Sequence, residues 1–134
     1  DRVNRSIRQL PDAIATRVQR IGFVGEEERD QRVADATVLV HPSYYEGFGF
    51  PIVEAMALGT PVVTTTGGAL PEIAQDAALM IDPGDVDALA GELIRVLEDE
   101  ETQERLIEAG RQRAANFSWA DTARGVVDVY RSLL

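Results

Sequence analysis

The sequence predicts an α/β fold in which a parallel sheet is covered by helices on both faces. Short apolar runs, rich in Val and Ile, alternate along the chain with longer amphipathic segments. The runs are apolar at consecutive positions, which is typical of strands buried on both faces of a parallel sheet. With 134 residues, 45% of them hydrophobic and 27% charged, the chain fits one compact domain.

The expected elements follow one another closely. Residues 1–17 are polar and weakly helical. Strands are predicted over residues 18–24, 38–40, 61–65 and 78–81. Helices are predicted over residues 26–36, 52–58, 70–74, 86–97, 101–115 and 119–133.

Capping residues define where the helices begin and end. Pro51 lies at a helix start and Gly59 at its end, where a left-handed residue stops the helix. Asp85 and Ser118 are N-cap candidates, because their side-chain oxygens can accept from amides of the first turn. Asp85 also forms a D-x-D pattern with Asp87, which we interpret as capping and not as a metal site.

Strands and helices in this order form a Rossmann-like layer, and ligands of such sheets bind at the carboxyl ends of the strands. Loops 41–51 and 65–71 leave those ends. The first loop contains Pro42, which cannot donate to a sheet ladder, and a glycine-rich run follows it. These two loops are therefore the predicted site.

The glycine-rich run is EGFGFPIVE, residues 46–54. Gly47 and Gly49 allow the backbone to approach a ligand, and the following helix start favours a phosphate or a sugar hydroxyl. Glu54 lies about one turn into that helix, and its side chain leans back toward the N-terminus. We therefore expect Glu46 and Glu54 to converge on one hydroxyl-rich ligand.

A longer pattern around this run resembles the group 1 (family 4) glycosyltransferases, which are retaining enzymes of two-domain GT-B architecture. The matching segments are residues 41–51, 54–63, 68–72, 82–85 and 117–119. Glu46 and Glu54 have the family's E-x7-E spacing, and the resemblance covers most of residues 18–134.

The resemblance implies a role for each residue of the two loops. Glu46 is the implied catalytic residue, which would hold the donor sugar against the diphosphate. The glycine-loop amides would contact sugar and phosphate, residues 51–53 would line the base and ribose pocket, and Glu54 would bind the ribose. The implied donor-binding residues are Ser43, Gly47, Phe48, Gly49, Pro51, Ile52, Val53, Glu54, Gly67 and Gly68.

The function implied by the resemblance is transfer of a hexose from a UDP-, GDP- or ADP-sugar to a glycan, lipid or small-molecule acceptor. Residues 1–134 would form a single, partial donor-binding domain, the C-terminal half of a GT-B enzyme without its first strand-helix unit. In the family, an Arg and a Lys upstream neutralise the diphosphate, and an N-terminal domain binds the acceptor. We therefore expect this fragment to be inactive alone and to associate with that domain or with itself, through the last helix and the open sheet edge.

Composition excludes several other classes. The net charge of −10 disfavours nucleic acids and anionic lipids as partners. There is no Cys, so disulfides and thiolate metal sites are excluded, and neither a metal nor a cofactor is expected. No apolar run reaches the roughly 18 residues of a membrane span. A cytoplasmic location is the default, with peripheral membrane association open for the full-length parent.

Several other residues receive no donor-binding role, and two other classes of protein remain as alternatives. His41, the sole histidine, is expected to be packed or hydrogen-bonded and not to act as a base. Phe117, Trp119 and Tyr130 are expected in the core or in helix packing, whereas apolar residues of the last helix are expected to be exposed. The alternatives are a non-catalytic Rossmann-like interaction module and, less favoured, a flavodoxin-like or receiver-type domain.

Overall fold

The computed structural model describes residues 2–133, and its centre is a three-stranded parallel sheet of order β1-β2-β3. The strands are β1 (Leu39–His41), β2 (Val62–Thr65) and β3 (Leu79–Ile81). Leu39 pairs with Val62, and Val63 pairs with Leu79. The strands predicted over residues 38–40, 61–65 and 78–81 are confirmed, each displaced by no more than one residue at either end.

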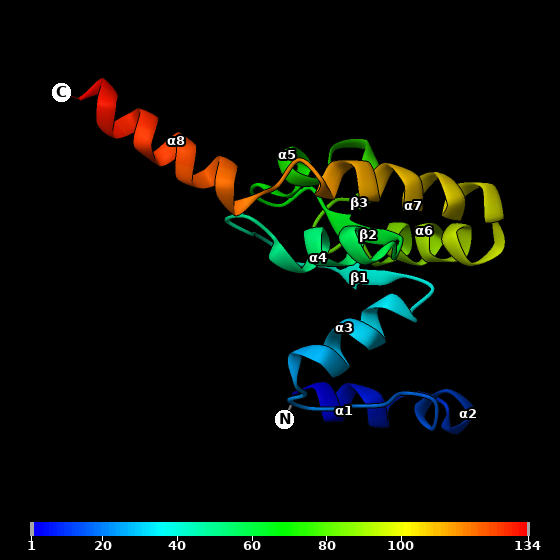
Figure 1. Ribbon diagram of the computed structural model, residues 1–134. Coiled ribbons are helices and arrows are strands. Elements are labelled where there is room, and N and C mark those ends of the chain that lie inside the picture. Colours follow the sequence, from blue (N-terminus) through cyan, green and yellow to red (C-terminus); the bar gives the residue numbers. More distant parts are fainter. Residues whose placement is uncertain (1, 134) are drawn as a thin grey trace.

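Helices connect these strands and surround the sheet (Figure 1). They are α1 (Arg2–Arg8), α2 (Asp12–Ala15), α3 (Glu26–Ala34), α4 (Phe50–Leu58), α5 (Leu70–Ala74), the 3-10 helix η1 (Gln75–Ala77), α6 (Val86–Glu98), α7 (Glu100–Ala114) and α8 (Trp119–Ser132). Figure 1 shows α8 extending away from the body, and α1 and α2 lying beyond α3 on the side away from α7. Each helix predicted from residue 26 onward is present.

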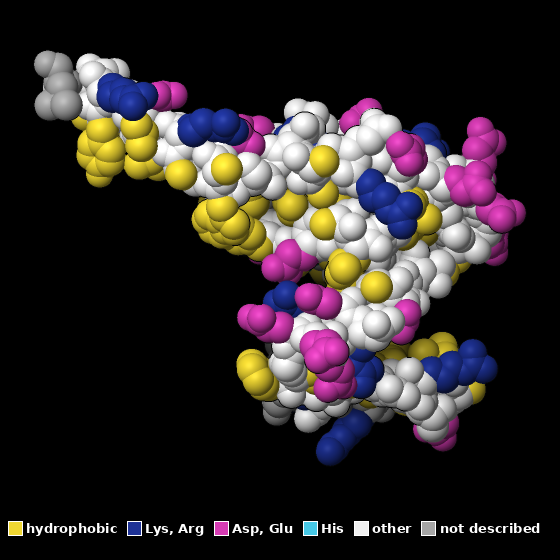
Figure 2. Space-filling view, viewed as in Figure 1, with side chains coloured by type: hydrophobic (Ala, Val, Ile, Leu, Met, Phe, Trp, Pro, Cys, Tyr) yellow, Lys and Arg dark blue, Asp and Glu magenta, His cyan; other side chains and the backbone are white. Residues whose placement is uncertain are grey.

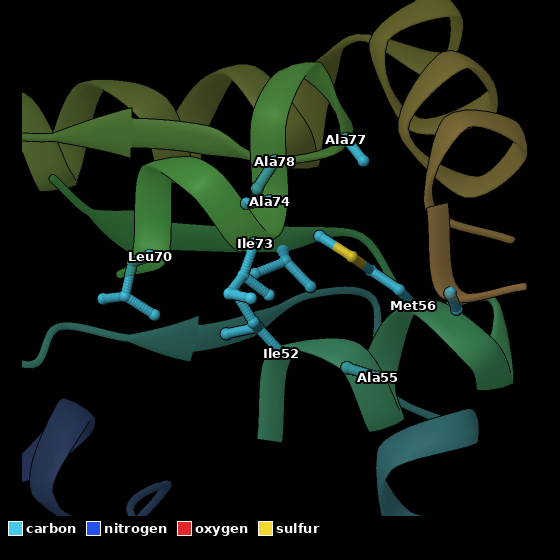
Figure 3. Close-up of a cluster of buried hydrophobic side chains, with 10 residues drawn as sticks. Ile52, Ala55, Met56, Leu70, Ile73, Ala74, Ala77 and Ala78 are labelled. Carbon is cyan, nitrogen blue, oxygen red and sulfur yellow. The ribbon is translucent and has the colours of Figure 1, made fainter. Parts of the chain in front are cut away.

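Helices cover both faces of the sheet, as the apolar runs predict. Val62 is fully buried on one face, in a cluster with residues of α4 and α5. Figure 3 shows Ile52 and Met56 of α4 and Leu70 of α5 in this cluster. The next residue, Val63, is fully buried on the other face, in a cluster with residues of α6 and α7. Burying one such side chain contributes about 1.5–3 kcal/mol, so the alternation fixes β2 between two helical layers.

The predicted N-caps are confirmed. The Asp85 carboxylate accepts from the Ala88 amide at 2.9 Å, which identifies the D-x-D pattern as a helix cap. The Ser118 hydroxyl accepts from the Asp121 amide at 3.0 Å and begins α8. Hydrogen bonds from Ser118 and then from Arg124 hold the pKa of the Asp121 carboxyl below its usual range.

The strand predicted over residues 18–24 is wrong. The structure places this segment in irregular backbone, where Val18 and Ile21 are about half exposed and Phe23 is 99% exposed. A β-branched run becomes a strand only when a neighbouring strand accepts its ladder of hydrogen bonds. In the described part of the chain the sheet consists of β1, β2 and β3, and residues 18–24 do not pair with it.

The expectation that Trp119 and Tyr130 could lie in the core is also wrong, because α8 leaves the body at its first residue (Figure 1). Trp119 is 79% exposed and Tyr130 is 67% exposed. Figure 2 shows hydrophobic side chains along one side of α8. As expected, this exposed apolar stripe includes Val126, Val127, Val129 and Leu133. Across residues 2–133, no helix has the length and apolar character needed to cross a membrane.

Candidate functional site

The two predicted loops meet at the carboxyl end of the sheet. The loop after β1 and the loop after β2 are joined by an isolated parallel bridge between Glu46 and Gly68. The Ala69 amide also donates to the Glu46 carbonyl oxygen at 2.9 Å. The backbone at Glu46 is therefore fixed by the second loop, although its side chain projects from the first.

Gly67 and Gly68 allow this close approach. A Cβ on Gly67 would lie 2.3 Å from the Tyr44 carbonyl oxygen, and one on Gly68 would lie 2.3 Å from the Glu46 carbonyl oxygen. Both obstacles are backbone atoms, which cannot swing aside as a flexible side chain can. These glycines hold one loop against the other, and their implied part in donor binding stays a prediction.

Two buried threonines at the end of β2 hydrogen-bond to the backbone of the first loop and fix its position. Thr64 donates its hydroxyl to the His41 carbonyl at 2.9 Å, and Thr65 donates to the Ser43 carbonyl. The Thr65 hydroxyl also accepts from the Gly67 amide at 3.3 Å. Both side chains are at most 1% exposed, so these hydrogen bonds form away from water.

Replacing Thr65 by Val should lower the free energy of unfolding by about 1–3 kcal/mol, because the buried hydroxyl bonds to Ser43 and Gly67 are lost without a compensating partner. Urea unfolding measures the change. Thr66→Val is the matched control, since Thr66 is exposed and its hydroxyl donates only on the surface, to Asp82 at 3.2 Å, which should contribute no more than about 0.5 kcal/mol. Equal effects of the two variants would contradict the assigned role of Thr65.

The glycine loop leads directly into α4. Gly49 is the N-cap residue with φ +99°, a left-handed conformation that favours glycine, and a Cβ there would lie 2.7 Å from Leu70. Gly47, in contrast, is exposed, and a Cβ on it would meet no heavy atom within 4 Å. The backbone at Gly47 is thus open to a ligand, while Gly49 and the half-buried Phe48 anchor the loop to the core.

The Glu46 carboxylate lies against the His41 imidazole. Glu46 Oε1 is 3.1 Å from His41 Nε2, and both side chains are partly buried. Because a carboxylate only accepts, Nε2 carries the proton and donates. His41 is hydrogen-bonded, as the sequence predicts, but its partner is the implied catalytic residue. Its position at the end of β1, five residues before a predicted site glutamate, is the signal in the sequence.

The Glu54 carboxylate faces a different neighbour. Glu54 Oε1 lies 3.7 Å from an Arg29 nitrogen of α3, and each side chain is about half exposed. Arg29 also hydrogen-bonds Asp30, and that bond, followed by the charge of Glu54, raises the pKa of Arg29. Glu46 and Glu54 therefore have separate partners, and their convergence on one ligand stays a prediction.

The other implied donor-binding residues differ in exposure. Pro51 is exposed and Val53 is half-buried, whereas the Ile52 side chain is fully buried in the core. Only the backbone of Ile52 could therefore reach a ligand. The Ser43 hydroxyl donates to the Tyr45 carbonyl at 3.3 Å, which ties it to its own loop.

An aromatic hollow lies beside Glu54, where α4 meets the start of α8. It has a volume of about 580 Å³. The Phe48 ring lies 4.7 Å from Phe50 and 5.6 Å edge-on from Phe117, and Phe50 stacks on Trp119 at 6.4 Å. Glu54 and Val53 also line the hollow. Trp119 is thus exposed but contacts the site, which the sequence alone did not indicate.

No group of three or more His, Cys, Asp or Glu side chains within residues 2–133 could hold a metal ion. The chemistry that this arrangement offers is hydrogen bonding from two carboxylates and from exposed loop backbone, next to a helix start and apolar rings. Such a surface suits a ligand with hydroxyl groups and a planar ring.

This chain belongs to the family described as "Glycosyl transferases group 1", which it matches over residues 12–113. Its fold is that of a GT-B glycosyltransferase domain. The solved sucrose-phosphate synthase of Thermosynechococcus elongatus superposes with a TM-score of 0.86 at 32% identity, over 98% of this chain and 33% of that one.

Curated relatives agree with the family. The chain is 38% identical to the O-antigen chain mannosyltransferase B of Escherichia coli, over 87% of this chain and 30% of that protein. It is 42% identical to the MMP alpha-(1->4)-mannosyltransferase of Mycolicibacterium hassiacum, over 83% of this chain and 28% of that protein. The chain thus spans less than a third of the length of these relatives.

Proposed function

We propose that this chain is the donor-binding part of a family 4 glycosyltransferase that transfers a hexose with retention of anomeric configuration. Two of its relatives are named mannosyltransferases, which supports a hexose as the transferred group. The observation that carries the proposal is the open loop at Gly47, which lies between Glu46 and the start of α4. A UDP-, GDP- or ADP-sugar fits this surface because it combines hydroxyls, a diphosphate and a planar base.

Each loop residue takes a part in the proposed complex. Glu46 accepts hydrogen bonds from the sugar, the backbone from Gly47 to Gly49 contacts the sugar and phosphate, and Glu54 accepts from the ribose diol. Val53 and the adjacent hollow are close enough to Glu54 to receive the base. Formation of the complex requires Glu54 to exchange its exposed Arg29 partner for the ribose, and an exposed ion pair contributes no more than about 1 kcal/mol.

We propose that the acceptor is a glycan, a lipid or a small molecule, and that the 134-residue chain alone does not complete transfer. The support is that this chain covers only about 30% of the length of the two mannosyltransferases. Catalysis of transfer needs charge stabilisation of the departing diphosphate, which is usually the largest catalytic contribution. Arg29, the cation that contacts Glu54, also pairs with Asp30, so its charge stays partly offset after Glu54 turns to the ribose.

Amide shifts during titration with UDP-glucose and GDP-mannose test donor binding. We expect one of the two probes to shift amides of residues 46–54 and of residues 67–69, because the two loops are bridged. Amides at the C-terminal end of α6, away from the Gly84 turn that lies beside Tyr44, should stay unchanged. An absence of shifts in both loops at millimolar concentrations of both probes and of ADP-glucose would contradict the proposal.

A second candidate is a non-catalytic interaction module, and the exposed apolar stripe of α8 favours it. Exposed stripes of this kind mark contacts with another surface. Under this alternative, diluting the protein should change the amide chemical shifts of α8, because self-association is lost. Neither nucleotide sugar should change the amide chemical shifts of the glycine loop. The two readouts come from the same labelled sample.

A further inference from the structure

We propose that His41 is a positioning residue that holds the Glu46 carboxylate in its ligand-binding orientation; this inference rests on the proposed function. The imidazole Nε2 and the carboxylate Oε1 are 3.1 Å apart, and the side chains are 22% and 33% exposed. His41 acts through Glu46 and need not touch the donor itself.

The backbones of both residues are already fixed by the second strand and its loop. His41 is paired in register with Thr64, whose buried hydroxyl donates to the His41 carbonyl. Glu46 is bridged to Gly68, and its carbonyl accepts from the Ala69 amide. The conformational freedom that remains is that of the long Glu46 side chain. His41 restricts it through one hydrogen bond to the carboxylate.

A fixed carboxylate improves binding because ordering a flexible side chain on association costs free energy. This cost is about 0.5–1.5 kcal/mol for one such side chain, which corresponds to about two- to tenfold in affinity. The His41 bond also leaves the second carboxylate oxygen of Glu46 available to accept from a ligand hydroxyl, since a carboxylate has about four acceptor positions.

Two variants of the full chain separate positioning from packing. His41→Gln keeps a side-chain N–H donor at about the same reach, while His41→Leu keeps an apolar volume without a donor. Whichever of UDP-glucose and GDP-mannose binds the wild type should bind His41→Leu about two- to tenfold more weakly, and His41→Gln should restore most of the loss. Glu98→Ala, an exposed carboxylate change on α6, is the net-charge control for the Glu46→Ala variant of the spectroscopic test.

Equal affinities of His41→Leu and wild type would overturn the inference, as would equal losses in His41→Leu and His41→Gln. Thermal unfolding of each variant, without ligand, shows whether a loss of affinity follows from a loss of fold. A purely structural role would move the two thermal midpoints and the two affinities in parallel.

The imidazole signal provides a second readout without a ligand. His41 is the only histidine, so both imidazole signals in a nitrogen-15 spectrum belong to it, and their couplings to the ring protons distinguish Nε2 from Nδ1. Glu46→Ala should shift the His41 Nε2 resonance, and Glu98→Ala should not. An unchanged resonance in Glu46→Ala would contradict the pair. A wild-type chain that binds neither probe nor ADP-glucose contradicts the proposed function, and this spectrum then still decides whether His41 holds Glu46.

Discussion

Replacing Gly67 by Ala should lower the free energy of unfolding by about 2–4 kcal/mol and lower the thermal midpoint by about 10 °C. The added Cβ would lie 2.3 Å from the Tyr44 carbonyl oxygen and 3.3 Å from that of Ser43, so the two loops must separate. Separation also breaks the Thr65 contacts with Ser43 and Gly67. Circular dichroism during heating measures the loss.

Gly47→Ala is the matched control for this variant. Gly47 lies in the partner loop and is exposed, and a Cβ added to it would have no heavy atom within 4 Å. The same chemical change there should alter the thermal midpoint by less than about 2 °C. If both variants unfold at the same temperature, the close approach of the loops does not stabilise the fold as we describe.

Replacing Glu54 by Ala should weaken nucleotide-sugar binding by about ten- to a hundredfold, because hydrogen bonds between a ribose diol and a carboxylate are lost. The fold should be retained, since Glu54 is about half exposed and its contact with Arg29 is a surface ion pair. Titration with UDP-glucose or GDP-mannose, followed by amide shifts, measures the affinity.

The control for this prediction is Glu98→Ala, which removes an equal charge from an exposed position on α6. It should leave the affinity within about twofold of the wild-type value, because screening weakens the effect of a distant exposed charge. Equal losses in Glu54→Ala and Glu98→Ala would show that net charge, and not a contact with the ribose, determines binding.

Most of the fold could be predicted because its signals are local. Apolar runs locate β2 and β3, and the caps at Asp85 and Ser118 locate the starts of α6 and α8. The strand predicted over residues 18–24 failed because a strand also needs a partner, which a local run does not specify. The exposure of Trp119 was missed for a related reason, because it depends on the direction in which α8 leaves the body.

The sequence predicts which two loops form the site, but it does not predict the side-chain contacts within the site. Motif spacing placed Glu46 and the glycines at the carboxyl end of β1, and the bridge to Gly68 joins the two predicted loops. The partners of the carboxylates, His41 and Arg29, depend on side-chain orientation in three dimensions. The burial of Ile52 likewise follows from how α4 packs on the sheet.

The central claim is that Glu46 and Glu54 bind one nucleotide sugar across the Gly47 loop. A crystal structure of the chain with the probe that shifts its amides tests this most directly. We predict that Glu46 accepts from a sugar hydroxyl while still bonded to His41, and that Glu54 turns from Arg29 to the ribose. A probe bound elsewhere, with Glu54 still facing Arg29, would contradict the account.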